Sequence, residues 1–179
     1  SAEQVLAALE RGSMRARAAE RSRAQRRTLA AYVSGEPLAA SDAAIPKSAL
    51  CSVTTPPPAK ALAGPSWNGW GLGIGNTRFQ SAHAAGLTAE QVPRLALKWA
   101  FGFPGASSAG TQPVIVGGRV YVATAEGELY VLDAKTGCVY WTLEVEAAIR
   151  SAVTLDERQD GTLVAYFGDQ SANVYAVDA

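Results

Sequence analysis

Residues 127–141, GELYVLDAKTGCVYW, combine two short apolar alternations with a turn signal between them. Leu129 and Val131 occupy alternating positions before the turn, and Val139 and Trp141 do so after it. This pattern predicts a strand, a tight turn and a second strand. In the DAKTG turn, the Asp carboxylate can accept hydrogen bonds from turn amides, and the Gly can adopt positive φ without a steric penalty.

The same pattern occurs twice. Tyr130, in YVLDA, recurs as Tyr175, in YAVDA, 45 residues later, and Tyr121 recurs as Tyr166 at the same offset. A period of this length with several strands per unit is typical of β-propeller blades. Two unrelated hairpins of a sandwich are the competing interpretation, but the period, the turn and the aromatic positions all agree. We therefore predict an all-β propeller fragment of about two blades, the second incomplete.

The first 35 residues are predicted to be helical instead. Apolar residues recur at helical spacing up to Leu9. A second helix is predicted to begin at Ser22, where Gln25 completes a capping box, and to end at Gly35. The sequence thus indicates a small α-helical unit ahead of the sheets.

Residues 36–66 are predicted to be a linker without regular structure, because six prolines are mixed with Ala, Ser and Thr. Residues 67–179 form the blade segment. Within it, a capping box at Thr88 predicts a short helix limited by Pro93. Apolar alternation from Leu95 to Trp99 then predicts a strand.

The charge of the chain is balanced overall but divided between its two parts. The formal net charge is zero, which argues against nucleic acid or a membrane surface as the main partner. Residues 1–35 contain seven Arg and three Glu, so the remainder carries the compensating negative charge. The chain has neither an apolar run long enough to span a membrane nor a signal peptide. Because it starts without Met and stops inside a repeat, we expect a fragment cut at both ends.

Four groups of motifs carry family resemblances. The D-x-x-T-G-x-x-x-W turn resembles the tryptophan-docking repeat of quinoprotein propellers, and predicts that Trp141 is buried between blades. NTRF at residues 76–79 and KWAF at residues 98–101 resemble the entry segment of dehydrogenases that use pyrroloquinoline quinone (PQQ). WNGWG and KWAFGFP resemble their polyvinyl-alcohol dehydrogenase branch. Met14, in a loop between two helices of which the second ends in AAYV, resembles the C-terminal part of a class I cytochrome c.

The resemblance implies a function for the parent protein. It implies a quinohaemoprotein that oxidises alcohols, polyvinyl alcohol or other secondary alcohols among them. The cofactors would be PQQ and Ca²⁺, and electrons would pass to haem c and on to a cytochrome c-type acceptor. It also implies a periplasmic location. The catalytic Asp and the Ca²⁺ carboxylates are expected on blades beyond Ala179.

The resemblance assigns few residues within this chain. Arg150 matches a family Arg that contacts the anionic oxygens of the quinone, a task suited to a guanidinium fork, although a surface Arg at a strand start is the simpler interpretation. Many relatives have an acidic cofactor contact where Gly110 stands here, so Thr111 and Gln112 are candidates to supply hydrogen bonds in its place. A vicinal Cys pair of many relatives is also replaced here, by Glu144 and Val145.

Met14 is the candidate sixth ligand of the haem iron, since a thioether favours Fe(II); a packing role is the alternative. The CxxCH motif that would attach the haem is expected upstream of Ser1. His83 is interpreted as a loop residue. Cys51 and Cys138 form an even pair that suits a disulfide in an oxidising compartment, but spacing alone leaves this open.

Two other functional classes compete with an alcohol dehydrogenase. One is a non-catalytic propeller scaffold for protein–protein interaction, like the outer-membrane assembly lipoproteins that share the repeats. The other is a cytochrome-bearing propeller that only relays electrons. The Arg-rich helical face is most simply a solvated surface, and its alternative is a docking patch for an acidic electron-transfer partner.

Overall fold

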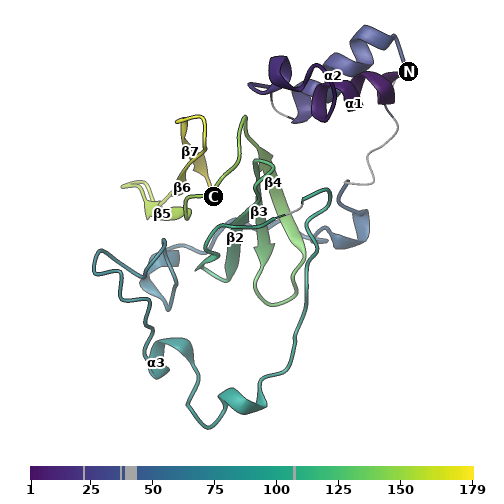
Figure 1. Ribbon diagram of the computed structural model, residues 1–179. Coiled ribbons are helices and arrows are strands. Elements are labelled where there is room, and N and C mark those ends of the chain that lie inside the picture. The colour runs from purple at the N-terminus through teal and green to yellow at the C-terminus, as the bar shows by residue number, and fades with distance from the viewer. Residues whose placement is uncertain (22, 37, 39–43, 107) are drawn as a thin grey trace.

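The computed structural model describes residues 1–21, 23–36, 38, 44–106 and 108–179. It consists of a helical unit, a long irregular segment and two antiparallel sheets (Figure 1). Within this described part of the chain, none of the helices combines the length and the apolar character that crossing a bilayer requires.

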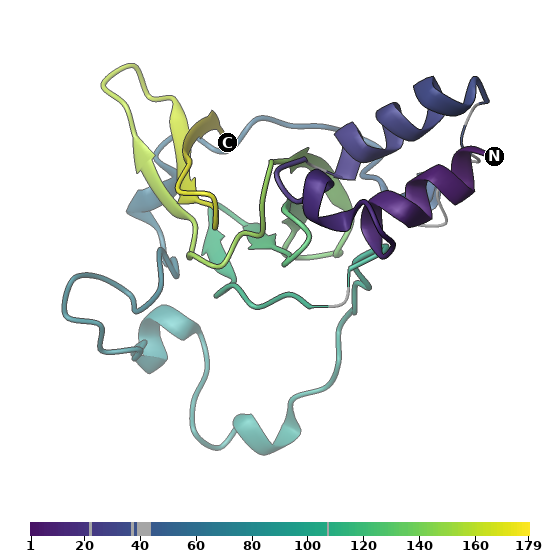
Figure 2. The ribbon, with the colours of Figure 1, turned by 45° about the horizontal axis from the view of Figure 1, so that its top comes forward.

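The helical unit is a pair of helices that lie side by side (Figure 2). Its elements are α1 (Ala2–Glu10), the 3₁₀ helix η1 (Arg15–Ala18) and α2 (Arg23–Ser34). Leu9, Ala18 and Ala30 form its small buried core. The two predicted helices are therefore confirmed, and η1 is an addition. The predicted capping box at Ser22 lies outside the described residues.

The proline-rich linker contains two short 3₁₀ helices, η2 (Lys47–Ala49) and η3 (Ala61–Ala63), where no regular structure was predicted. The linker is also attached to the first sheet. The Cys51 N–H donates to the Val139 carbonyl oxygen at 2.9 Å, and Cys51 forms a disulfide with Cys138. The structure thus settles the pairing that spacing left open.

Between the linker and the sheets lie α3 (Ala82–Ala85) and η4 (Val92–Arg94). The prediction of a helix from Thr88 was wrong, although the Gln91 side chain does accept a hydrogen bond from the Thr88 N–H at 2.8 Å. The predicted strand was also wrong. Residues 95–99 are described and form no strand, and Leu97 is 85% exposed, because no described strand lies beside them to pair with.

The predicted pair of antiparallel sheets is confirmed. The first has the order β1-β2-β3-β4 and consists of β1 (Val114–Val116), β2 (Arg119–Ala123), β3 (Glu128–Asp133) and β4 (Val139–Glu144). The second has the order β5-β6-β7 and consists of β5 (Thr154–Glu157), β6 (Leu163–Gly168) and β7 (Val174–Asp178). The sheets are propeller-like in strand order and in the way they stack.

The main core lies between the two sheets. Val114 of β1, Tyr121 of β2 and Val131 of β3 are paired across the first sheet, and all three are buried in this core. The second sheet contributes apolar side chains such as Leu155 and Phe167. Such face-to-face burial of alternating residues is what stabilises stacked sheets.

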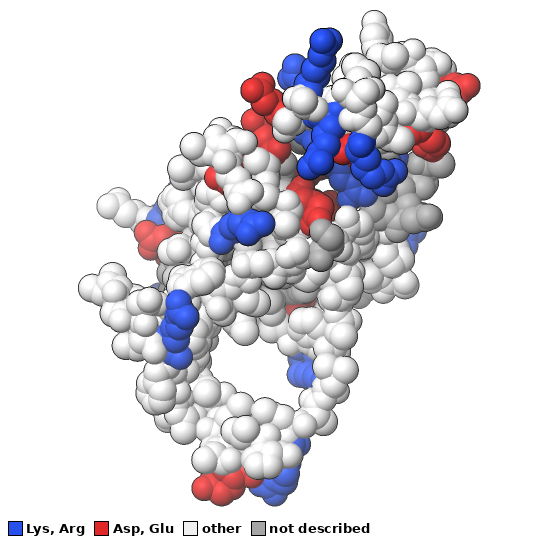
Figure 3. All heavy atoms as spheres, viewed as in Figure 1, with Lys and Arg blue, Asp and Glu red and all other residues white. Residues whose placement is uncertain are grey.

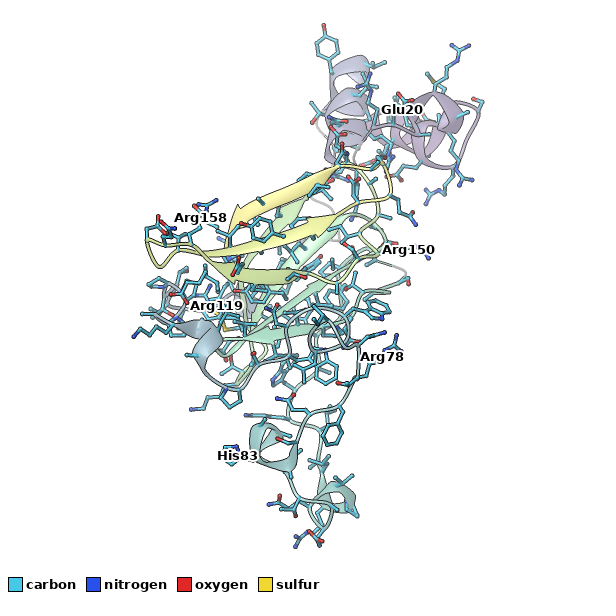
Figure 4. The ribbon with its side chains drawn as sticks, turned by 90° about the vertical axis from the view of Figure 1, so that its left-hand side faces the viewer. Glu20, Arg78, His83, Arg119, Arg150 and Arg158 are labelled. Carbon is cyan, nitrogen blue, oxygen red and sulfur yellow. A yellow bond between two sulfur atoms is a disulfide. The ribbon has the colours of Figure 1, made fainter. Side chains whose placement is uncertain are left out.

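The antiparallel strands end on two opposite faces, which we call the entry face and the turn face. The entry face contains the starts of β1 and β5 and the loops 124–127, 145–153 and 169–173. The turn face contains the DAKTG turn. Figure 4 shows Arg150 on the entry side of the sheets, with Arg119 and Arg158 on the opposite side.

The DAKTG turn holds a tryptophan, but one that precedes the sheet. The Trp99 ring lies against Gly137, where an added Cβ would come within 2.7 Å of ring carbon Cδ2, and the Trp99 Nε1–H donates to the Ala134 carbonyl oxygen at 3.2 Å. Trp141, predicted to be buried between blades, is only partly buried against the core between the two sheets.

Candidate functional site

The entry face is a continuous surface because hydrogen bonds join its loops. The Val145 N–H donates to the Gly127 carbonyl oxygen at 2.8 Å, and the Ile149 N–H donates to that of Thr124 at 3.3 Å. The Gln170 N–H donates to the Ala148 carbonyl oxygen at 2.9 Å, which ties the second sheet to the first. The backbones of these loops are therefore held in place relative to one another.

Arg150 lies between two anchored neighbours at this face. Ile149 is fully buried. The Ser151 hydroxyl accepts from the Gly168 N–H at 3.0 Å and donates to the Gly168 carbonyl oxygen at 2.9 Å. Arg150 itself is exposed, and its side chain extends from the entry side (Figure 4). The arrangement presents an exposed guanidinium between two anchored residues, which suits binding of an anionic oxygen.

Thr111 and Gln112 lie before β1 at the same face, but only one is free to act. The Thr111 hydroxyl donates to the Ala123 carbonyl oxygen at 3.1 Å and accepts from the Ala123 N–H at 2.9 Å. Thr111 is buried, and its only hydroxyl proton is used inside the sheet. Gln112 is partly exposed, and its Nε2 donates a long hydrogen bond of 3.4 Å to the Pro113 carbonyl oxygen. Gln112 is therefore the better candidate donor.

A segment that the sequence did not mark as part of the site runs along the inner edges of both sheets. The backbone of Trp67 exchanges two hydrogen bonds of 2.8 Å with Ile115 of β1. The Asn68 side chain does the same with the backbone of Leu155 of β5, donating from Nδ2 and accepting at Oδ1, both at 2.8 Å. The side-chain amide of Asn68 thus pairs with the edge of β5 as a backbone peptide group of a neighbouring strand would. The signal in the sequence was the WNGWG string, whose target strands could not be inferred.

The loop that follows this segment is strained and partly apolar. Leu72, Asn76 and Arg78 all have positive φ, at 58°, 45° and 50°, a conformation that clusters at functional or tightly constrained sites. A hollow of about 620 Å³ lies between this loop and Thr154 of β5. The Arg78 guanidinium carbon lies 5.8 Å from the centre of the Trp70 ring, which provides a cation–π contact.

Met14 lies in the turn between α1 and η1. Its carbonyl oxygen accepts from the N–H groups of Arg17 and Ala18 at 3.0 and 3.1 Å, so the backbone is ordered by η1. The side chain is 43% exposed and is thus accessible to a ligand. An exposed thioether can serve as a soft axial ligand, which is the role that the resemblance predicts for Met14.

A calcium site does not fit the part of the chain that the structure describes, because no group of three His, Cys, Asp or Glu side chains there could hold a metal. The turn carboxylates are engaged structurally. Asp133 accepts from Thr136 and Tyr140, and Asp169 accepts from Asn173 and Tyr175. His83 is exposed, but it lies in the short helix α3, so its interpretation as a loop residue was wrong.

A family model and two curated relatives match this chain. The family model described as "Outer membrane protein assembly factor BamB" matches residues 80–179. A polyvinylalcohol dehydrogenase of Pseudomonas sp is 44% identical over 126 residues, which cover 69% of this chain and 19% of that protein. A polyvinylalcohol dehydrogenase of Sphingopyxis sp. (strain 113P3) is 36% identical over 132 residues, which cover 72% of this chain and 19% of that protein.

Among solved structures, a europium-containing methanol dehydrogenase is 26% identical, with a TM-score of 0.31, over 37% of this chain and 12% of that one. The chain spans about a fifth of the length of the curated relatives that it matches. The match to the repeat family covers both sheets and the segment that leads into them. The chain therefore belongs to the PQQ-repeat propeller family and is similar there to PQQ-dependent dehydrogenases.

Proposed function

We propose that this chain is the junction between a cytochrome c-like domain and the first two blades of a quinohaemoprotein alcohol dehydrogenase. The parent protein would oxidise alcohols, polyvinyl alcohol or other secondary alcohols, in the periplasm, and pass electrons through haem c to a cytochrome c-type acceptor. The observation that carries the proposal is the exposed Arg150, held between anchored residues on the same face as Gln112. The similarity to two polyvinylalcohol dehydrogenases supports it.

In this proposal, the chain's own residues bind and orient the quinone. The Arg150 guanidinium would form paired hydrogen bonds with its anionic oxygens, and Gln112 would donate an amide hydrogen bond. Thr111 would act through the backbone, because its hydroxyl holds Ala123 of β2 next to the start of β1. PQQ, when bound, supplies two-electron oxidation of the alcohol.

Substitution of Arg150 in the full-length protein tests the quinone part. Loss of a charge-assisted hydrogen bond in Arg150→Ala should raise the dissociation constant for PQQ about 10- to 100-fold, while Arg150→Lys should be intermediate. Binding is measured by titrating PQQ against quinone absorbance, and activity by alcohol-dependent reduction of a dye. Arg158→Ala is the control, since Arg158 lies on the turn side and pairs with Asp178. Equal PQQ affinity in Arg150→Ala and wild type would show that Arg150 does not bind the quinone.

Substitution of Met14 tests the haem part. In Met14→Ala, the low-spin spectrum of a Met-ligated haem should be lost and the reduction potential should fall, because the soft axial donor is gone. Turnover with a cytochrome-type acceptor should collapse, whereas turnover with a dye that takes electrons from the quinone should survive. An unchanged spectrum would make Met14 a packing residue.

A propeller scaffold for protein–protein interaction is the second candidate, and the description of the matching family model favours it. The two candidates differ in cofactor dependence. A scaffold would neither bind PQQ at micromolar concentration nor reduce a dye in the presence of alcohol. Absence of both activities in the full-length protein, with its fold intact by circular dichroism, would support the scaffold.

A further inference from the structure

The helical unit and the entry face enclose a cleft of about 910 Å³. The wall formed by the helical unit contains the side chains that we call the Arg face: Arg11, Arg15, Arg23 and Arg26. The opposite wall is formed by entry-face loops that contain Glu126 and Glu146, together with Ala125, Ala147, Ala148 and Gly105. Figure 3 shows basic and acidic side chains close together where the helical unit meets the sheets.

The two walls have complementary charge. The Arg face supplies four cations, against one acid of its own wall, Glu10. The loops opposite supply two carboxylates and are otherwise small and uncharged. Arg23 also interacts electrostatically with Tyr130 in β3 of the first sheet. Burial and the neighbouring Glu128 raise the pKa of Tyr130, and the positive charge of Arg23 partly opposes this rise.

Arg26 is already ordered at the cleft. Its Nη1 donates to the Arg21 carbonyl oxygen at 2.6 Å and to that of Ala18 at 3.4 Å. Its Nε is buried and has no hydrogen-bond partner among the described residues. A buried guanidinium donor without an acceptor is unfavourable, so a carboxylate that approached across the cleft would be stabilised.

The cleft joins the two parts of the candidate site. Arg15 is the residue after Met14, and Ala148 lies two residues before Arg150. A contact between the walls therefore brings the turn that contains Met14 to the face that contains Arg150.

We propose that the Arg face docks on the acidic loops of the same chain, through Glu126 and Glu146, and holds the helical unit against the entry face. The acidic partner suggested by the Arg-rich helices is then part of this chain and not a separate protein. The consequence for electron transfer rests on the proposed function, because it requires haem at Met14 and quinone at Arg150. The docking itself does not.

Charge reversal in the full-length protein tests the docking. Arg11→Glu with Arg15→Glu should repel the loops, and Glu126→Arg with Glu146→Arg should repel the Arg face. Each pair of substitutions should increase the radius of gyration measured by small-angle X-ray scattering. High salt should do the same to the wild type, because salt screens the attraction between exposed charges. The four substitutions together should restore the compact form. Arg17→Glu with Arg21→Glu is the control, with the same charge change away from the cleft.

Single-turnover stopped flow then measures electron transfer from quinone to haem. We expect each one-sided reversal to slow this step at least about 10-fold, as misplacement of reacting groups does, and the fourfold variant to recover it. Unchanged scattering in both one-sided variants, or failure of the fourfold variant to restore it, would overturn the docking. A change in scattering without any quinone-to-haem step would uphold the docking and refute the proposed function instead.

Discussion

The two sheets carry the same repeat, yet equivalent positions differ in burial. Tyr121 and Leu129 of the first sheet are fully buried, whereas Tyr166 and Val174, each 45 residues later, are 37% and 83% exposed. The first pair faces the second sheet. The second pair faces a side that no described residue covers to the same extent. The comparison teaches that the repeat specifies a sheet with two apolar faces, and that the neighbouring sheet decides whether a face is buried.

On the opposite face of each sheet, burial again depends on the neighbouring segment. Tyr130 and Leu132 of β3 pack under Trp99, Phe101 and Phe103, which come from the segment before the first sheet. Their equivalents in β7, Tyr175 and Val177, pack against the first sheet. Residues 99–103 thus take the place of a preceding sheet for the first one. Four predictions, from the largest effect to the smallest, test this difference between the sheets.

The disulfide belongs to the first sheet alone and should make the largest contribution. Cys51 and Cys138 are 87 residues apart, and opening a loop of this length is expected to cost about 4 kcal/mol. Replacing both residues by Ser should lower the free energy of unfolding in urea by this amount. Wild type with its disulfide reduced is the control and should match the double variant. A loss below about 1 kcal/mol would show that the linker is held by other contacts.

Truncation at equivalent positions should reproduce the difference in burial. Leu129→Ala removes a fully buried side chain and should cost about 3 kcal/mol, whereas Val174→Ala removes an exposed one and should cost less than about 0.5 kcal/mol. Chemical denaturation monitored by tryptophan fluorescence measures both. Equal costs would mean that the uncovered face of the second sheet is buried in solution, for example by another copy of the chain.

The contact between Trp99 and Gly137 can be tested with a matched pair of glycines. Gly137 and Gly161 both have positive φ, at 78° and 85°, so Ala strains the backbone at either position. Only at Gly137 does the new Cβ also meet the Trp99 ring, since the atom nearest to it at Gly161 is 4.0 Å away. We expect a cost of about 1 kcal/mol for Gly161→Ala and about 1 kcal/mol more for Gly137→Ala. Equal thermal stabilities would contradict the ring contact.

Acid should affect the two turn carboxylates alike, because both are clamped in the same way. Burial acts to raise the pKa of Asp133 and of Asp169, but hydrogen bonds from Thr136 and Tyr140, and from Asn173 and Tyr175, outweigh it and lower both. A lowered pKa in the folded state stabilises the fold above the usual Asp value, and this contribution is lost as the pH falls below about 4. Asp133→Asn and Asp169→Asn should each flatten the stability curve between about pH 4 and 2. A flattening in only one variant would show that the hydrogen bonds to Asp133 and to Asp169 do not stabilise the fold equally.

Much of the candidate site could not be predicted, because it depends on contacts between distant parts of the chain. The match of Arg150 to a family motif was local, and the alternative of a strand start was wrong, because Arg150 lies in the loop before β5. The hydrogen bonds between the Thr111 hydroxyl and the Ala123 backbone could not be predicted, because the sequence does not show which group a hydroxyl will contact. The double hydrogen bond of Asn68 with Leu155 joins residues 87 positions apart, and no periodicity reports such a pair.

The sequence by itself determined the elements whose causes are local. The 45-residue repeat and the DAKTG turn predicted two antiparallel sheets, and helical spacing predicted the first helices. Only the tertiary structure decided that Trp99 fills the DAKTG turn, that Leu95 and Leu97 remain unpaired, and that Cys51 reaches Cys138. The physical reason is that a strand or a turn follows from side-chain alternation and backbone freedom. What covers a face, fills a turn or closes a disulfide depends on which distant segment lies beside it.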